Sequence, residues 1–272
     1  MAKKKKLKKK LYKPVIARKD YADEHFYYVD GKYFPSVTKI LHEGMPTPFA
    51  LKYWIGEVGN ERANQKLEKA GARGTLIHNT CEELLRGKEV DLEYLFKNKS
   101  DKKCIVSFID WVYQTQPKYN TKYIEFVVAS DKGFAGTVDF FCYINGEPWI
   151  IDFKTSGGVY ESHKLQLVAY RYAFEQMTGI HANMGILHLN YRLKRGWSFV
   201  EKMEIKKKPL IIEDYMTVLE MYKLVNGGVI PEPKEVDVYP NKVRLFDSNG
   251  EVNGKKSKKS PKKVKQNRKK NA

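Results

Sequence analysis

Asp139, Asp152 and Lys154 lie on either side of a predicted tight turn. The dipeptide Asn145-Gly146 stands between two apolar runs, and both of its residues tolerate the positive φ angles of a type I′ hairpin turn. Counting back from this turn places Asp139 directly opposite Asp152. Opposed side chains share one face of a sheet with Cβ atoms about 4.5 to 5.5 Å apart. The sequence therefore predicts two carboxylates side by side, with the ammonium group of Lys154 on the same face.

Two opposed carboxylates repel each other unless a cation lies between them. Carboxylate oxygens suit Mg²⁺ or Mn²⁺, which keep positions open for water and substrate phosphate. Lys154 adds a positive charge where a scissile phosphate would lie. The alternative is an ordinary hairpin whose polar face carries a weak surface ion network. In either case we expect the reverse face to be core, with Val138, Phe140, Cys142, Trp149, Ile151 and Phe153.

Glu125 and His78 are further candidates for this site. Glu125 is the one acid in the apolar segment 123–129, which predicts a buried strand, and a buried glutamate needs a partner or a cation. His78 follows a predicted helix cap at Thr75 and shares a helical face with Glu82. The alternative for His78 is an ordinary histidine at the surface or at the edge of the core.

Gln166 and Tyr170 are four residues apart in a helix predicted for residues 162–177, so they share one face and can point into the site. The alternative is a polar residue and an aromatic residue at a helix edge. Other predicted elements surround the hairpin: a second hairpin over 25–38 that turns at Asp30-Gly31, a helix over 49–70 that stops at Gly71, helices over 103–116 and 210–225, and strands over 182–193 and 197–205.

The net charge of +18 is concentrated at the two ends of the chain. Residues 1–13 hold eight lysines and residues 254–272 hold nine lysines and one arginine, with no acid in either segment. Such blocks stay disordered and commonly bind nucleic acid, although a solubilising tail and a nuclear targeting signal are alternatives. We therefore expect a basic arm at 1–13, an N-terminal hairpin and helical lobe at 14–72, a main domain at 73–230, an extended exit at 231–253 and a basic tail at 254–272.

The sequence contains neither a run of apolar residues long enough to cross a bilayer nor a secretory signal. We therefore expect an intracellular, cytoplasmic protein that does not contact a membrane. Its three cysteines are far apart and include no Cys-x-x-Cys pair, so neither a disulfide framework nor a cysteine metal cluster is predicted.

Five motifs in this order resemble the PD-(D/E)XK nuclease superfamily, and most closely its RecB-like exonuclease branch, which includes phage exonucleases and the mitochondrial genome maintenance exonuclease. They are Gly-Thr-Leu-Ile-His78, Glu125 in its apolar strand, Gly136-Thr-Val-Asp139, Ile151-Asp-Phe-Lys-Thr155 and Gln166-Leu-Val-Ala-Tyr170. The resemblance implies an α/β fold of the α+β type, with a restriction-endonuclease-like core in which helices flank a mixed central sheet, and an N-terminal helical lobe.

The resemblance also implies metal ligands. Asp139, Asp152 and His78 would bind Mg²⁺ or Mn²⁺, and the backbone carbonyl of Phe153 would be a further ligand. Glu125 would hold a second metal ion or shape the outer shell of the first. Some members carry an iron–sulfur cluster held by four cysteines, and this chain has too few cysteines for it. We therefore expect no iron–sulfur cofactor.

The remaining motif residues would act on the substrate. By the resemblance, Lys154 would orient the attacking water or stabilise charge in the transition state, and Gln166 and Tyr170 would position Lys154 and the DNA backbone. The expected protein is a Mg²⁺-dependent deoxyribonuclease. It would be an exonuclease that acts on DNA ends or single strands in replication, recombination or repair, and a phage is one expected source. The alternatives are a structure-specific endonuclease and a non-catalytic nucleic-acid-binding protein on a nuclease-like scaffold.

Overall fold

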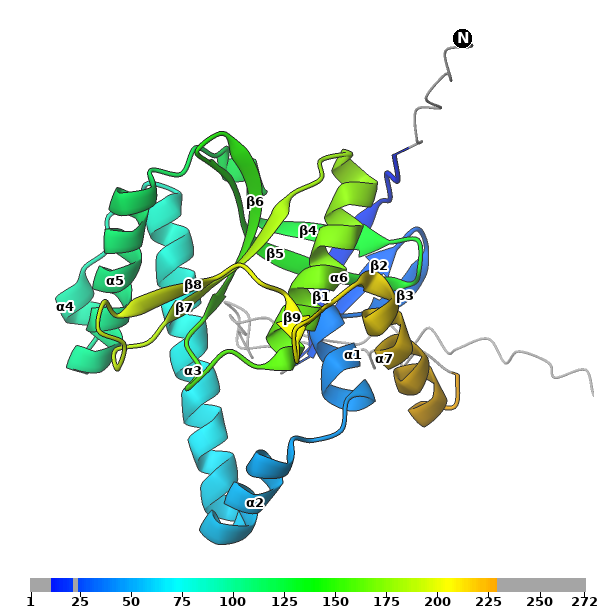
Figure 1. The fold of residues 1–272 in the computed structure, drawn as a ribbon, viewed down its shortest axis with the longest axis horizontal. Helices are drawn as coiled ribbons and strands as arrows, with labels where there is room; N and C mark the ends of the chain where they lie inside the picture. The colour runs from blue at the N-terminus through cyan, green and yellow to red at the C-terminus, as the bar shows by residue number, and fades with distance from the viewer. Residues whose placement is uncertain (1–10, 22–23, 229–272) are drawn as a thin grey trace, which may run out of the picture. The chain divides into compact units, whose positions relative to one another are not determined.

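A mixed five-stranded sheet forms the middle layer of the described part of the chain, and helices cover both of its faces (Figure 1). The computed structural model describes residues 11–21 and 24–228. The strands run in the order β4 (Ile124–Ser130), β5 (Phe134–Ile144), β6 (Glu147–Lys154), β7 (Asn183–Leu189) and β8 (Trp197–Val200). Only the β6–β7 pair of this sheet is parallel. This architecture confirms the predicted mixed α/β fold of the α+β type.

The helices and the smaller strands complete the described part of the chain. The helices are α1 (Val37–Gly44), α2 (Phe49–Val58), α3 (Asn60–Leu85), α4 (Leu92–Leu95), α5 (Lys99–Thr115), α6 (Glu161–Thr178) and α7 (Ile212–Val225), with a 3₁₀ turn at Thr121–Tyr123. The smaller strands are β1 (Ile16–Tyr21), β2 (Glu24–Val29), β3 (Lys32–Pro35), β9 (Glu204–Ile205) and β10 (Lys208–Pro209). None of the described helices combines the length and apolar character needed to cross a bilayer. The expected extended exit and basic tail, and residues 1–10 of the first arm, lie outside the described residues.

Hydrophobic cores lie against both faces of the sheet. On one side α1, α6 and α7 pack through buried residues such as Ile40, Phe174 and Tyr215. On the other side α3 and α5 contribute Ile77 and Trp111. Because both faces are covered, most side chains of the sheet are buried in one core or the other. Asp139 and Asp152 lie directly beyond the last paired residues of β5 and β6.

The central hairpin has the predicted turn and register. Asn145 and Gly146 form the loop with φ angles of 53° and 85°, which are the left-handed values that a type I′ turn requires. The β5–β6 pairing runs from Ile144 opposite Glu147 back to Phe140 opposite Ile151. The same register places Asp139 at the next position, opposite Asp152, where the regular pairing ends.

The predicted apolar face of this hairpin is wrong at Val138. Val138 belongs to the core under α6, whereas Phe140 belongs to the core under α3 and α5. In the neighbouring strand β4, Glu125 has a φ of 52°, which breaks the usual alternation of side chains. Ile124 consequently joins the α3 side and Phe126 the α6 side. The two strands thus exchange faces at Glu125 and Asp139.

The helix predicted for residues 49–70 is two helices. Gly59 has a φ of 85° and separates α2 from α3. Gly71, the predicted stop, lies inside α3, and the predicted cap Thr75 donates a hydrogen bond to the Gly71 carbonyl within the helix. The break falls at Gly59 because only that position adopts the left-handed backbone, whereas Gly71 is tolerated in the helix interior.

Candidate active site

Asp139 lies where β5 and β6 diverge, and its carboxylate joins two elements of the site. The Oδ2 atom accepts a hydrogen bond from the backbone N–H of Phe153 at 2.7 Å. The same oxygen lies 3.5 Å from Nδ1 of His78, which α3 presents from the opposite side. Burial raises the pKa of Asp139, while the charge of Lys154 and the Phe153 N–H act in the opposite direction. The predicted proximity of strand and helix residues is therefore present.

Asp152 is the most deeply buried carboxylate of the site, with a side chain that is 1% exposed. Its Oδ2 atom meets Nζ of Lys154 at 2.8 Å. Its Oδ1 atom is buried and has no hydrogen-bond donor among the described residues. Burial raises the pKa of Asp152 to about 6, although the charge of Lys154 lowers it. Burying an ionised carboxylate with one oxygen unpaired lowers the stability of the fold, unless a ligand such as a cation binds that oxygen.

His78 is a neutral imidazole in this environment. Burial, together with the charge of Lys154, lowers its pKa to about 4, although Asp152 and a hydrogen bond to the Phe153 backbone act in the opposite direction. A neutral histidine can offer a lone pair to a cation. The structure brings His78 and Asp139 together, and the Phe153 N–H bonds to the same Asp139 oxygen.

Glu125 lies beside His78 and Asp139 in a cavity of about 260 Å³ that Gly74, Thr75 and Asn79 also line. Burial raises the pKa of Glu125 to about 8, and the charges of Asp139 and Glu82 add to that effect. A glutamate with positive φ is uncommon and costs backbone strain, of a kind that clusters at functional sites. Glu125 thus faces the same cavity as the other two candidate ligands.

Gln166 and Tyr170 lie on α6 behind the strand ends. Nε2 of Gln166 donates to the Tyr170 hydroxyl at 3.0 Å, and both side chains are buried. The Tyr170 ring packs so closely on Gly136 that a Cβ there would overlap it. Gln166 also lines a larger groove of about 720 Å³ together with Lys154 and His163. The described structure therefore places Gln166 and Lys154 on one groove wall.

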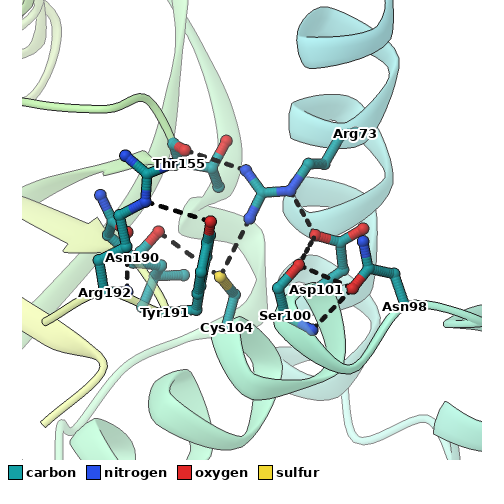
Figure 2. A network of polar contacts seen from close by, with 10 residues as sticks. Arg73, Asn98, Ser100, Asp101, Cys104, Thr155, Asn190, Tyr191 and Arg192 are labelled. Atoms are coloured by element: carbon teal, nitrogen blue, oxygen red, sulfur yellow. Dashed lines mark hydrogen bonds and ion pairs between the residues drawn. The ribbon is translucent and has the colours of Figure 1, made fainter.

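The segment that follows Lys154 is held by residues that the sequence patterns did not single out. Arg73 of α3 donates from Nη1 to the Thr155 carbonyl at 3.1 Å, contacts the Asp101 carboxylate through Nε, and lies 3.3 Å from the Cys104 sulfur (Figure 2). On the next strand, Nε2 of His188 lies 2.7 Å from the Ser156 carbonyl. Both contacts fix the backbone directly after Lys154. Arg73 stands immediately before the Gly-Thr-Leu-Ile-His motif, which is the only hint of its role in the sequence. Its partners Thr155 and Asp101 are distant in sequence, so the contacts could not be predicted.

The donor atoms at the strand ends are of types that divalent cations bind. The free Oδ1 of Asp152 and the Asp139 carboxylate are oxygen donors of the kind that Mg²⁺ and Mn²⁺ accept, and the neutral His78 adds a nitrogen donor, which transition metals accept more readily than Mg²⁺ does. Within residues 11–21 and 24–228, however, no three His, Cys, Asp or Glu side chains already form a group that would enclose a metal ion. Lys154 occupies one oxygen of Asp152, so its ammonium group would have to turn aside as a cation binds.

No protein-family model matches the sequence, and a search of curated proteins found no match. The expected relationship to PD-(D/E)XK nucleases therefore rests on the motifs and on the geometry of the strand ends.

Proposed function

We propose that this protein is a metal-dependent deoxyribonuclease of the PD-(D/E)XK type, acting as an exonuclease on DNA ends or single strands. The observation that carries the proposal is the buried Asp152 carboxylate, which is paired with Lys154 through one oxygen and has the other oxygen free. Asp139 and His78 lie at the same strand ends. Burying these charges costs desolvation free energy, and buried ionisable groups with shifted pKa values cluster at functional sites, which supports the proposal.

The residues of this chain take distinct parts in the proposed reaction. Asp139, Asp152 and His78 would hold the metal ion, and Glu125 would hold a second ion or the water around the first. When bound, the divalent ion supplies Lewis acidity toward the phosphodiester. Lys154, released from its ion pair, would place its positive charge against the reacting phosphate. Gln166 would help to orient that phosphate, because it lines the same groove as Lys154.

Incubation of the full chain with end-labelled linear DNA tests the proposal. We expect mononucleotides or short oligonucleotides to be released in Mg²⁺ or Mn²⁺ and not in EDTA. Covalently closed circular DNA should remain intact, because an exonuclease needs an end. A Lys154→Ala protein prepared in the same way excludes a contaminating nuclease.

Two outcomes would overturn this proposal in different ways. Cleavage of closed circles would make the protein an endonuclease. Intact linear DNA in Mg²⁺ and Mn²⁺, under conditions where the protein binds that DNA, would leave a binding protein without catalysis.

Metal binding should depend on pH because the ligands hold protons. Burial raises the pKa of Asp152 to about 6, so below that pH a cation must displace a proton. The affinity for Mg²⁺ is therefore expected to rise by up to about tenfold per unit from about pH 5 to 6 and to level off above this range. Calorimetric titration in buffers of different protonation enthalpy measures both the affinity and the protons released. An affinity that stays constant over this range would contradict the assignment of Asp152 as a ligand.

A further inference from the structure

Helix α2 and the first half of α3 form an arm that contributes little to either core (Figure 1). No residue of α2 is buried, although most of its residues are apolar. In the first half of α3, Ala63 is the buried residue. An apolar helix that packs so little of its surface is unusual for a segment that serves only the fold.

Two aromatic rings of α2 lie stacked and open to solvent. Phe49 is 83% exposed and Tyr53 is 60% exposed. Their ring centroids are 6.5 Å apart and the planes differ by 27°, so the two rings lie nearly parallel. An exposed stacked pair can add a third flat ring without moving its own side chains.

The arm forms one rim of the 720 Å³ groove that leads to Lys154. Pro48, Ala50 and Leu51, which surround Phe49 in the sequence, line this groove together with Lys154 and Gln166. Tyr160, half exposed at the start of α6, lines it as well. Phe49 and Tyr53 stand outside the lining, on the helix whose neighbouring residues form part of it.

Lysine side chains lie at both ends of this surface. The charged residues of the described groove lining are Lys154 and Glu161, and His163 adds no positive charge because burial lowers its pKa to about 3. Lys52 projects from α2 between Phe49 and Tyr53 in the sequence and is exposed. A polyanion with flat, unsaturated rings matches both features, since it can place phosphates at the cationic end and rings on the aromatic surface.

We infer that Phe49 and Tyr53 form a base-stacking platform that guides single-stranded DNA into the groove toward Lys154. The inference rests on the proposed function, because that function identifies the occupant of the groove as DNA. In a duplex the faces of the bases are already stacked on one another, so only an unpaired strand can offer a base to these rings. Stacking depends on flat faces and not on base edges, so the platform would accept any sequence.

The test separates base stacking from attraction to phosphates. Fluorescence anisotropy in EDTA would compare an oligothymidylate of about 12 nucleotides with an abasic oligomer of the same length and label. The lysine-rich ends of the chain attract both oligomers alike through their phosphates. We expect the full-length protein to bind the thymidylate about tenfold or more tightly than the abasic oligomer, since each stacked base contributes to affinity.

A double variant locates the effect. Phe49→Leu with Tyr53→Leu keeps the helix and its apolar character but removes both rings, and we expect the preference for thymidylate to disappear. Tyr113→Leu is the matched control, because Tyr113 is an exposed aromatic residue, 72% exposed, on a different helix, α5. This control should keep the preference.

The outcomes distinguish the inference from the proposed function. Equal affinity of the native protein for both oligomers, or no binding of either, would overturn the platform. Retention of the preference in the double variant would overturn it as well. A change of molar mass in the double variant by light scattering, with the preference retained, would assign the surface to a second copy of the chain.

Hydrolysis of bis(p-nitrophenyl) phosphate in Mn²⁺ tests the catalytic residues separately, because that ester needs no base-stacking surface.

Discussion

Asp152→Asn is expected to lower the rate of DNA hydrolysis by about 10³-fold or more and, at the same time, to stabilise the protein in EDTA at neutral pH. The rate falls because the amide has no charge to hold a divalent ion and offers an N–H where a ligand oxygen is needed. The stability rises because the native carboxylate is buried with Oδ1 free of any donor in the described structure. Opposite changes in activity and stability are typical of a functional residue and not of a structural one.

The sign of the stability change follows from the pKa of Asp152. Burial raises this pKa from its ordinary value of 3.8 to about 6 in the folded state. Between these values the folded protein binds more protons than the unfolded chain, so stability is lost as the pH rises through this window. The asparagine variant avoids this loss, which corresponds to about 2 to 3 kcal/mol above pH 6. Urea denaturation of both proteins at several pH values measures it.

Glu147→Gln is the control for this experiment. Glu147 begins the same strand but is exposed, so the amide should change neither the rate nor the pH dependence of stability. If Asp152→Asn retained hydrolysis near the native rate, or if it were strongly destabilising at neutral pH, Asp152 would be a structural residue and the proposed site would be wrong.

Gly136→Ala is expected to destabilise the protein by about 2 to 3 kcal/mol and to impair hydrolysis. A Cβ at Gly136 would overlap the buried ring of Tyr170, and α6 packs Tyr170 into the core so that the ring has no free space to enter. Any displacement of Tyr170 also disturbs its 3.0 Å hydrogen bond from Gln166. Chemical denaturation gives the loss of stability, and assays at saturating Mg²⁺ give the loss of rate.

Gly71→Ala provides the comparison, because nothing lies within 4 Å of the position of its Cβ and the residue is inside α3. Alanine should stabilise that helix by up to about 1 kcal/mol. Equal effects of the two substitutions would show that Tyr170 yields to the added methyl group, and the proposed role of this contact would fail.

The strand ends were predictable because a single local signal sets their geometry. Asn145-Gly146 determines the turn, and the turn determines which residues of β5 and β6 face each other, as the observed pairing shows. Asp139, Asp152 and Lys154 follow from that register. The cap of α1 is equally local, because the Oγ of Ser36 accepts a hydrogen bond from the Lys39 N–H three residues further on.

The exchange of faces at Glu125 could not be predicted in this way. Positive φ is uncommon for a glutamate, and no propensity favours it in a strand, so the alternation of apolar residues was extended through a position where it fails. Packing of the two cores on either side of the sheet offsets the conformational strain at Glu125. Because that packing involves the whole sheet, the local sequence does not reveal it.

Residues joined over long distances were also beyond sequence patterns. Arg73 reaches Thr155 and Asp101 only after α3, α5 and β6 have packed together. The choice of Gly59 over Gly71 as the helix break is similar, since both are glycines in an otherwise helical segment and the chain direction at each is set by tertiary packing.

Because α2 and the first half of α3 contain almost no core residues, this arm tolerates substitutions better than the rest of the described chain. Substitutions in this arm leave the central sheet and its two cores intact, so they carry little thermodynamic penalty. Substitutions at the strand ends disturb groups that are buried and tightly packed. If the proposed nuclease function holds, sequence changes in this arm would alter substrate binding and leave the strand-end residues intact, so the arm is the segment to randomise in a search for altered specificity.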